Sequence, residues 1–270
     1  MENQRFKNQS GLLTTEKLNK SVLVVGAGAI GSFYAVTIAK MGFTNILVYD
    51  EDTVEDHNIA NQMYPEIMVG RKKVDALERV VSDYSGVKIS KIDKFWHPEN
   101  AKDAEIVVMA TDNMDARIAI WNHYKNKGTT KLIIDGRMGA QVFRAYCVDL
   151  SCPDKTFYES TLYPQKDAAP DRCTMKSIIF TVLGVASCMA NLTKQWVMEE
   201  YRPTAIEYDF VNHKQFTDFI AHKEIGSELE SNEEENNPGG IGGNDAAEGS
   251  EGGHPLQGSN GPTTESKEKS

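Results

Sequence analysis

The sequence lacks any hydrophobic run long enough to cross a membrane. Its longest apolar runs are Val22–Val25 and Ile106–Ala110, whereas a membrane-spanning helix needs about 20 predominantly apolar residues. The first residues, MENQRFK, contain no apolar segment of the signal-peptide type, which argues against secretion. We therefore expect a cytoplasmic protein that does not interact with a membrane.

Cysteine is scarce, and no Cys-x-x-Cys pair is present. The four cysteines are Cys147, Cys152, Cys173 and Cys188. Without a secretion signal, we expect them to be reduced thiols rather than disulfides. Structural zinc sites commonly use Cys-x-x-Cys pairs, so the sequence predicts no zinc.

An excess of positive charge is also missing. The formal net charge is −10, and residues 224–270 hold 11 of the 39 acidic residues but only 2 of the 29 basic residues. The remainder, residues 1–223, carries 28 acidic and 27 basic side chains and is nearly neutral. A nucleic-acid-binding domain normally has a basic patch. Neither part of the chain has one, so we expect no nucleic-acid partner.

Residues 224–270 contain no aromatic residue and are rich in Gly, Ser and Glu. Such a segment buries too little apolar surface to offset the entropy that is lost on ordering it. We predict a disordered acidic tail over 224–270, which serves as a solvated appendage or as a docking segment. Residues 1–223 are predicted to form a single nucleotide-binding domain.

Residues 1–223 alternate between short apolar runs and longer amphipathic segments. This alternation is typical of an α/β fold with a mostly parallel, doubly wound, Rossmann-like sheet. The predicted strands are 21–25, 45–49, 87–92, 105–110, 131–135, 141–148 and 205–211, and 205–211 is the last of them. The predicted helices are 30–41, 70–84, 115–127 and 177–200.

A glycine-rich loop follows the first predicted strand and opens the first predicted helix. Gly26, Gly28 and Gly31 form the Gly-x-Gly-x-x-Gly arrangement. In this context it allows a tight turn, a close approach of backbone to phosphate, and close packing of helix on strand. Asp50 ends the second predicted strand, where its carboxylate can accept hydrogen bonds from ribose hydroxyls. The loop predicts a nucleotide but does not distinguish NAD from ATP.

Three further motifs follow in order. They are Asp50-Glu-Asp52 with Asn58, Gly70-Arg-Lys-Lys73, and Thr111-Asp112-Asn113. With the glycine loop, they make residues 1–211 resemble the ThiF/HesA/MoeB family, the adenylating domains of enzymes that activate ubiquitin-like and sulfur-carrier proteins. The resemblance implies that Asp50 binds ribose, with Asp52 as a second acid, and that Asn58 and Lys73 contact the nucleotide.

The same resemblance implies that Asp112 is associated with Mg²⁺ and that ATP is the nucleotide. The expected activity is adenylation of the C-terminal carboxylate of a small ubiquitin-like or sulfur-carrier-like protein that ends in Gly. Because both reactants are anionic, positive charge must offset their repulsion, and Lys73 is the candidate. Taken singly, Asp112 could instead cap the next helix and Lys73 could be a solvated lysine. Arg117 is interpreted as one half of a structural ion pair.

Two departures from the family pattern weaken the expectation of full activity. Asn61 stands where the family has an Arg before Gln62, and Arg71 and Lys72 are the cations that could compensate. Asn8 replaces an Arg that reaches the partner subunit's ATP site, which leaves Lys7 as a weaker candidate. The partial match still predicts a homodimer.

Cys173, within Pro170-Asp-Arg-Cys-Thr-Met-Lys176, resembles the cysteine that receives the activated carboxyl in modifier-activating enzymes. Arg172 and Lys176 would favour its thiolate. The alternatives are a plain structural cysteine and the remnant of a zinc site. Cys147 and Cys188 are predicted to pack in the core.

Asp135-Gly-Arg137-Met-Gly139 follows the fifth predicted strand. Arg137 could steer a C-terminal carboxylate, or it could be a surface Arg in a turn. Two other functions stay open. An NAD(P)-dependent oxidoreductase would use the glycine loop and Asp50. A degenerate, non-catalytic scaffold would account for Asn8 and Asn61.

Overall fold

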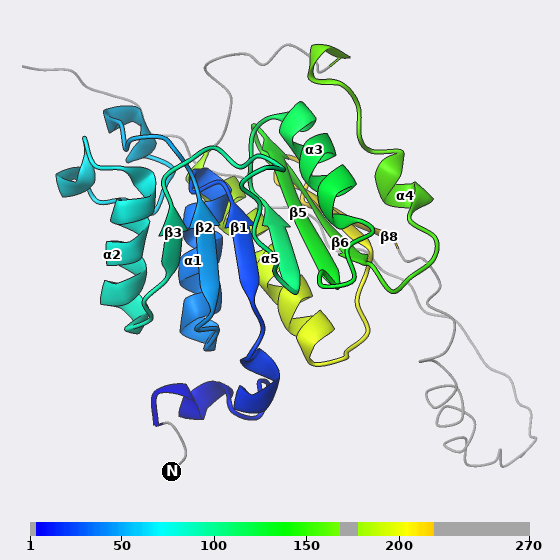
Figure 1. The fold of residues 1–270 in the computed structure, drawn as a ribbon, viewed down its shortest axis with the longest axis horizontal. Helices are drawn as coiled ribbons and strands as arrows, with labels where there is room; N and C mark the ends of the chain where they lie inside the picture. Colours follow the sequence, from blue (N-terminus) through cyan, green and yellow to red (C-terminus); the bar gives the residue numbers. More distant parts are fainter. Residues whose placement is uncertain (1–3, 168–177, 219–270) are drawn as a thin grey trace, which may run out of the picture. The chain divides into compact units, whose positions relative to one another are not determined.

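The computed structural model describes residues 4–167 and 178–218, which build an eight-stranded sheet with helices on both faces (Figure 1). The strand order is β3-β2-β1-β4-β5-β6-β7-β8. The first five strands in this order are parallel, and β6, β7 and β8 continue the sheet in antiparallel fashion. The strands are β1 Val22–Val25, β2 Ile46–Tyr49, β3 Ser90–Ile92, β4 Ile106–Met109, β5 Leu132–Gly139, β6 Val142–Asp149, β7 Ala205–Asp209 and β8 Lys214–Asp218. The predicted α/β class with a mostly parallel sheet is confirmed.

The helices divide between the two faces of the sheet. Those of the first face pack in one hydrophobic cluster and those of the second face in another. The first face carries α1 Ala29–Met41, α2 Lys73–Ser85 and α5 Ile179–Val197, and the second carries α3 Met114–Tyr124 and α4 Thr156–Glu159.

Strand β1 shows why these runs are apolar without alternation. Val22 and Val24 belong to the first cluster, whereas Leu23 and Val25 belong to the second. Both faces of a parallel strand are covered by helices, so every side chain of the strand is buried. Helix α1 ends at Gly42, whose left-handed conformation lets its N–H pair with the carbonyls of Ile38 and Ala39, a common helix ending.

Two boundaries predicted from sequence are wrong. The predicted final strand at 205–211 corresponds to β7, but β8 follows it. Strand β8 has the sequence KQFTD, and all five residues are exposed. Without a buried face, its sequence lacks the apolar residues by which a strand is predicted. The predicted end of the fifth strand at Asp135 is also wrong, because β5 continues to Gly139 and pairs with β6.

Short helical turns connect these elements. They are η1 Gln4–Gln9, η2 Thr15–Leu18, η3 Asp56–Asn58, η4 Glu66–Met68 and η5 Gln165–Asp167. None of the helices within residues 4–167 and 178–218 is both long and apolar enough to cross a membrane. The predicted tail at 224–270 and Cys173 lie outside the described residues.

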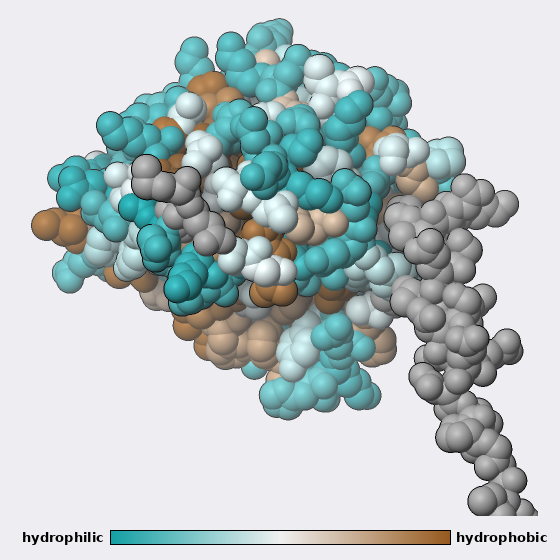
Figure 2. Space-filling model, turned by 90° about the horizontal axis from the view of Figure 1, so that it is seen from below, coloured by the Kyte–Doolittle hydropathy of each residue, from teal (hydrophilic) through white to brown (hydrophobic). Residues whose placement is uncertain are grey.

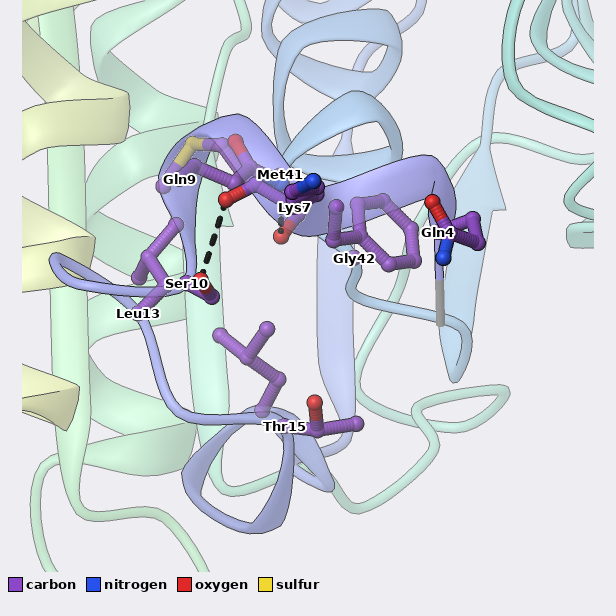
Figure 3. Close-up of a pocket in the computed structure, with 10 residues that line it drawn as sticks. Gln4, Lys7, Gln9, Ser10, Leu13, Thr15, Met41 and Gly42 are labelled. Carbon is purple, nitrogen blue, oxygen red and sulfur yellow. Dashed lines mark hydrogen bonds between the residues drawn. The ribbon is translucent and has the colours of Figure 1, made fainter. Parts of the chain in front are cut away.

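Turn η1 packs at the C-terminal end of α1. Gln9 Nε2 donates to the carbonyls of Lys40 and Met41, which the helix itself leaves unpaired. Between η1, η2 and the helix end is a cavity of about 120 Å³, with Lys7 and Leu13 among its lining residues (Figure 3). It is smaller than the roughly 300 Å³ at which ligand pockets usually begin. The view from below is covered mostly by hydrophilic residues, with hydrophobic ones gathered along its lower margin (Figure 2).

Candidate active site

The glycine loop lies where the chain leaves β1 for α1. Gly26 has φ +100°, and a Cβ there would lie 2.6 Å from the carbonyl oxygen of Ala110. A Cβ on Gly31 would lie 1.9 Å from the carbonyl oxygen of Gly26. Gly28 differs, because a Cβ there would meet no atom within 4 Å. Packing therefore explains Gly26 and Gly31, whereas Gly28 faces open space that a ligand could occupy.

Asp50 is tied to this loop at the end of β2. Its Oδ2 accepts the Ala27 N–H at 2.7 Å, and its Oδ1 accepts the Asp52 N–H at 2.9 Å. Burial raises the pKa of Asp50, while the Ala27 hydrogen bond and the charge of Lys73 act in the opposite direction. Each carboxylate oxygen has a second lone pair, so both can still accept a ribose hydroxyl.

Lys73 begins α2 and is almost buried. Its Nζ lies 2.7 Å from Asp52 Oδ2, and the side chains of Lys73 and Asp52 are 10% and 64% exposed. Tyr64 connects this region to the glycine loop, because its hydroxyl donates to the Ala27 carbonyl at 2.5 Å and lies 3.4 Å from the Lys73 carbonyl. The ammonium is thus held beside the loop and is no ordinary solvated lysine.

Asn58 is buried in η3, and its amide already has one partner. Its Oδ1 accepts the Glu55 N–H at 2.9 Å, which stabilises the turn in which it lies. A contact with nucleotide would have to come from its amide nitrogen. Nearby, Gln62 Oε1 is buried without a hydrogen-bond partner among the described residues. Met63, the next residue, donates its N–H to Ser32 Oγ in the first turn of α1, which ties this segment to the helix that follows the glycine loop.

Asp112 lies just beyond β4 and is exposed. The alternative that it caps α3 is wrong, because Asn113 Oδ1 accepts the Ala116 N–H at 3.0 Å and makes that cap. The Met114 N–H is taken by Gln165 Oε1 at 2.7 Å. Within the described part of the chain, Asp112 forms no ion pair. Its carboxylate is therefore available to a ligand, whereas the N–H groups of Met114 and Ala116 are already used.

The topology brings Asp50 and Asp112 to the two sides of the glycine loop. Strand β1 lies between β2 and β4, and Val25 pairs with Tyr49 on one side and with Met109 on the other. In such sheets, ligands bind at the carboxyl ends of the strands, where the strand order reverses. In the present sheet the strand order reverses between the carboxyl ends of β1 and β4.

The interpretation of Arg137 as a surface residue in a turn is wrong. Arg137 lies inside β5, its side chain is only 15% exposed, and it contacts Asp135 at 2.7 Å. Its Nη1 donates to the Thr161 carbonyl and its Nη2 to Thr161 Oγ1, while the guanidinium stacks 4.6 Å from the Tyr146 ring. That Arg137 steers a C-terminal carboxylate stays a prediction.

Arg117 forms the predicted structural ion pair. Its Nε lies 2.9 Å from Asp135 Oδ1, and both side chains are buried. Tyr158 also donates its hydroxyl to Asp135 at 2.9 Å. Burial alone would raise the pKa of Asp135, but Arg117 and Arg137 together lower it below its usual value. The sequence offered no signal for Tyr158, Thr161 or Gln165, because these residues lie far along the chain from their partners.

The described cysteines include two that pack in the core. Burial raises the pKa of Cys147 and of Cys188 to about 12, so both remain protonated thiols of low reactivity. Their predicted structural role is confirmed. The predicted nucleophile Cys173 lies outside the described residues.

Lys7 and Asn8 lie at the end of α1 opposite the glycine loop. Helix α1 has 13 residues, which corresponds to about 20 Å at 1.5 Å per residue. Figure 1 places the N-terminal turns below the sheet, beyond the amino end of β1. A cation on η1 could therefore serve only the site of another copy of the chain.

Together, the loop, the acidic strand ends and the buried lysine are features of an α/β nucleotide-binding fold. The sequence model of the ThiF family matches residues 3–232. The chain therefore belongs to the ThiF family.

The matched relatives are adenylating enzymes. The chain is 34% identical over 117 residues to an adenylyltransferase and sulfurtransferase MOCS3-1 from Zea mays, covering 41% of this chain and 25% of that protein. It is 29% identical over 119 residues to a ubiquitin-like modifier-activating enzyme 5 from Dictyostelium discoideum, covering 38% of this chain and 31% of that protein. The aligned region thus spans between a quarter and a third of these two relatives.

The solved structures confirm the fold. Escherichia coli MccB, crystallised with ATP, superposes with a TM-score of 0.64 at 18% identity, covering 84% of this chain and 74% of that one. A crystal structure of PaaA gives a TM-score of 0.64 at 18% identity, covering 79% of this chain and 68% of that one.

Proposed function

We propose that the protein is an ATP-dependent adenylyltransferase acting on the C-terminal carboxylate of a small ubiquitin-like or sulfur-carrier-like protein that ends in Gly. One observation carries the proposal. Gly28 opens onto free space at the point where the strand order reverses, with Asp50 and Lys73 on one side and Asp112 on the other. The relatives support it, because their names describe adenylyltransferases and activating enzymes.

Each residue then has a role. Asp50 holds the ribose through its free lone pairs, and the backbone at Gly28 and the amino end of α1 face the phosphates. The carboxylate of the carrier attacks the α-phosphorus of ATP, the bond to the β-phosphate oxygen breaks, and pyrophosphate leaves. Lys73 offsets the charge that grows on this leaving group. Asn58 donates from its amide nitrogen, and Asp52 holds the Lys73 ammonium in position.

Mg²⁺ fits the residues that are present. Asp112 offers an exposed carboxylate, the type of oxygen ligand that Mg²⁺ prefers. Within the described part of the chain, no three His, Cys, Asp or Glu side chains gather as a metal site. The ion would therefore take its other ligands from phosphate and water, as is usual for Mg²⁺. When bound, it would neutralise phosphate charge.

Three further features belong to the same proposal. Cys173 is the candidate that receives the activated carboxyl, and the protein acts as a homodimer in which Lys7 approaches the partner's site. The place of action is the cytoplasm. The sedimentation mass of the full chain tests the dimer, and a thiol-labile carrier adduct that disappears in Cys173→Ala tests the nucleophile.

ATP–pyrophosphate exchange tests the proposed activity. The full chain is incubated with Mg²⁺, ATP, labelled pyrophosphate and a Gly-terminated small protein that copurifies from the source cell. We expect exchange that needs the carrier and falls at least about 100-fold in Asp112→Asn, the size of a typical loss of electrostatic stabilisation. Asp83→Asn is the control, because Asp83 is an exposed carboxylate in α2 that pairs with Arg79.

Unchanged exchange in a folded Asp112→Asn variant would contradict the proposed role of Asp112. Nucleotide binding without exchange would instead support a degenerate scaffold, for which Asn8 and Asn61 are the evidence. Tight NAD binding without ATP binding would support an oxidoreductase.

A further inference from the structure

Residues 52–54 and 70–73 form a short antiparallel ladder beside the glycine loop. Three backbone hydrogen bonds of 2.8–2.9 Å join the two segments, from Val54 N–H to Arg71 O, from Gly70 N–H to Val54 O and from Lys73 N–H to Asp52 O. Thr53 and Lys72 lie opposite each other as a bridge pair. The ladder fixes which side chains share a face.

Side chains alternate between faces along each strand, and residues directly opposite each other share a face. Because Thr53 and Lys72 share one face, Asp52 and Lys73 share the other, as their 2.7 Å ion pair shows. Lys73 begins α2, so the alternation of side chains along the strand ends there. Arg71 is two residues before Lys73, and residues two apart in extended backbone are about 7 Å apart, a distance that an arginine side chain can span.

The three basic residues of the ladder differ in their partners. Lys72 Nζ lies 2.6 Å from the Glu51 carbonyl and 3.2 Å from Asp93 Oδ1. Lys73 is paired with Asp52. Arg71 is exposed, and its guanidinium has no hydrogen bond or ion pair among residues 4–167 and 178–218. It is thus an uncommitted cation two residues from Lys73.

We propose that Arg71 binds the outer phosphates of the nucleotide alongside Lys73, which rests on the proposed function of the site. Lys73 is nearly buried beside the glycine loop, whereas Arg71 is exposed. A triphosphate that extends from the loop past Lys73 meets Arg71 with its β- and γ-phosphates. The planar guanidinium fork matches two phosphate oxygens at once, so Arg71 adds affinity for a triphosphate that a monophosphate does not receive.

Calorimetric titration of the full chain with ATP and with AMP, both with Mg²⁺, tests this role. Arg71→Gln removes the uncommitted charge, and Lys72→Gln removes the charge of the neighbouring residue, which already pairs with Asp93. We expect Arg71→Gln to raise the Kd for ATP about tenfold, in line with the loss of one charge-assisted contact. The Kd for AMP should change less than about twofold, and Lys72→Gln should leave both affinities near those of the wild type.

Arg71→Lys keeps the charge without the fork and should give an intermediate Kd for ATP. Equal losses for ATP and AMP would show that the ladder, not a phosphate contact, was damaged, and would overturn the role of Arg71. Equal effects of Arg71→Gln and Lys72→Gln would overturn it as well. If the wild-type chain bound no ATP, the proposed function would fail together with this inference. ATP binding that is unaffected in Arg71→Gln would remove the inference alone.

Discussion

At the residue scale, the three loop glycines match the spacing of the motif, but each position requires glycine for a different reason. The positive φ of Gly26 and the contact between Gly31 and Gly26 are demands of the fold, whereas Gly28 has empty space before it. Spacing alone predicted the loop. Spacing could not tell which glycines are required by packing and which leave room for a ligand, because that depends on the atoms around each Cα.

Alanine substitution should therefore lower the stability of the fold at Gly31 and the affinity for ATP at Gly28. Gly31→Ala places a Cβ 1.9 Å from the Gly26 carbonyl oxygen, so we expect a loss of about 1–3 kcal/mol in the free energy of unfolding. Gly28→Ala should change that free energy by less than about 0.5 kcal/mol but should weaken ATP binding, because the methyl group occupies the space before the loop. Urea unfolding and calorimetry measure the two effects. Equal stability losses in both variants would refute the distinction.

At the element scale, the buried carboxylate of Asp135 joins three parts of the fold. It binds Arg117 of α3, Arg137 of β5 and Tyr158 of α4. Near the start of α3, Asp115 Oδ1 accepts the Gln165 N–H, and Gln165 Oε1 accepts the Met114 N–H. These contacts hold the helix that follows Asp112.

Replacing Asp135 with Asn should destabilise the fold strongly. Two buried guanidinium groups would lose their shared counter-charge, and breaking a buried ion pair costs about 3–5 kcal/mol. The pKa of Asp135 is lowered in the folded state, so its stabilisation is present above the unfolded pKa of about 3.9 and is lost as pH falls through the folded value.

The unfolding free energy of the wild type should therefore fall more steeply with acid than that of Asp135→Asn in this range. Urea unfolding between neutral and acidic pH measures both curves. Parallel curves would show that Asp135 contributes no stability as a carboxylate.

The elements also show where sequence reasoning succeeded. Four strands and four helices were predicted to within a few residues, except for the end of one strand. They are β1, β2, β4 and β5, of which β5 has the misplaced end, and α1, α2, α3 and α5. The strands were predictable because burial on both faces makes their sequences apolar. Strand β8 was missed because it is polar and exposed. The end of β5 was misplaced because Gly136 and Gly139 suggested a turn. Gly136 instead lies against Met189, where a Cβ would come within 2.3 Å of the sulfur atom.

At the scale of the whole molecule, the parallel sheet followed from the alternation of strands and helices, and the family followed from four motifs in their order along the chain. The motifs are local in sequence, and the topology places Asp50 and Asp112 on either side of β1. The Asp135 network, the cap by Asn113 and the ladder that carries Arg71 were not predictable. Each depends on contacts between segments whose relative positions only the folded chain defines.

The central claim is that the site at the carboxyl ends of β1 and β4 binds a triphosphate and admits the end of another chain. A crystal structure of the full chain with Mg²⁺ and a non-hydrolysable ATP analogue tests this claim most directly. We predict the ribose at Asp50, phosphate oxygens at Gly28, Lys73 and Arg71, and the metal ion at Asp112. A nucleotide bound elsewhere, or a nicotinamide ring accepted at the same site where ATP is refused, would contradict the account.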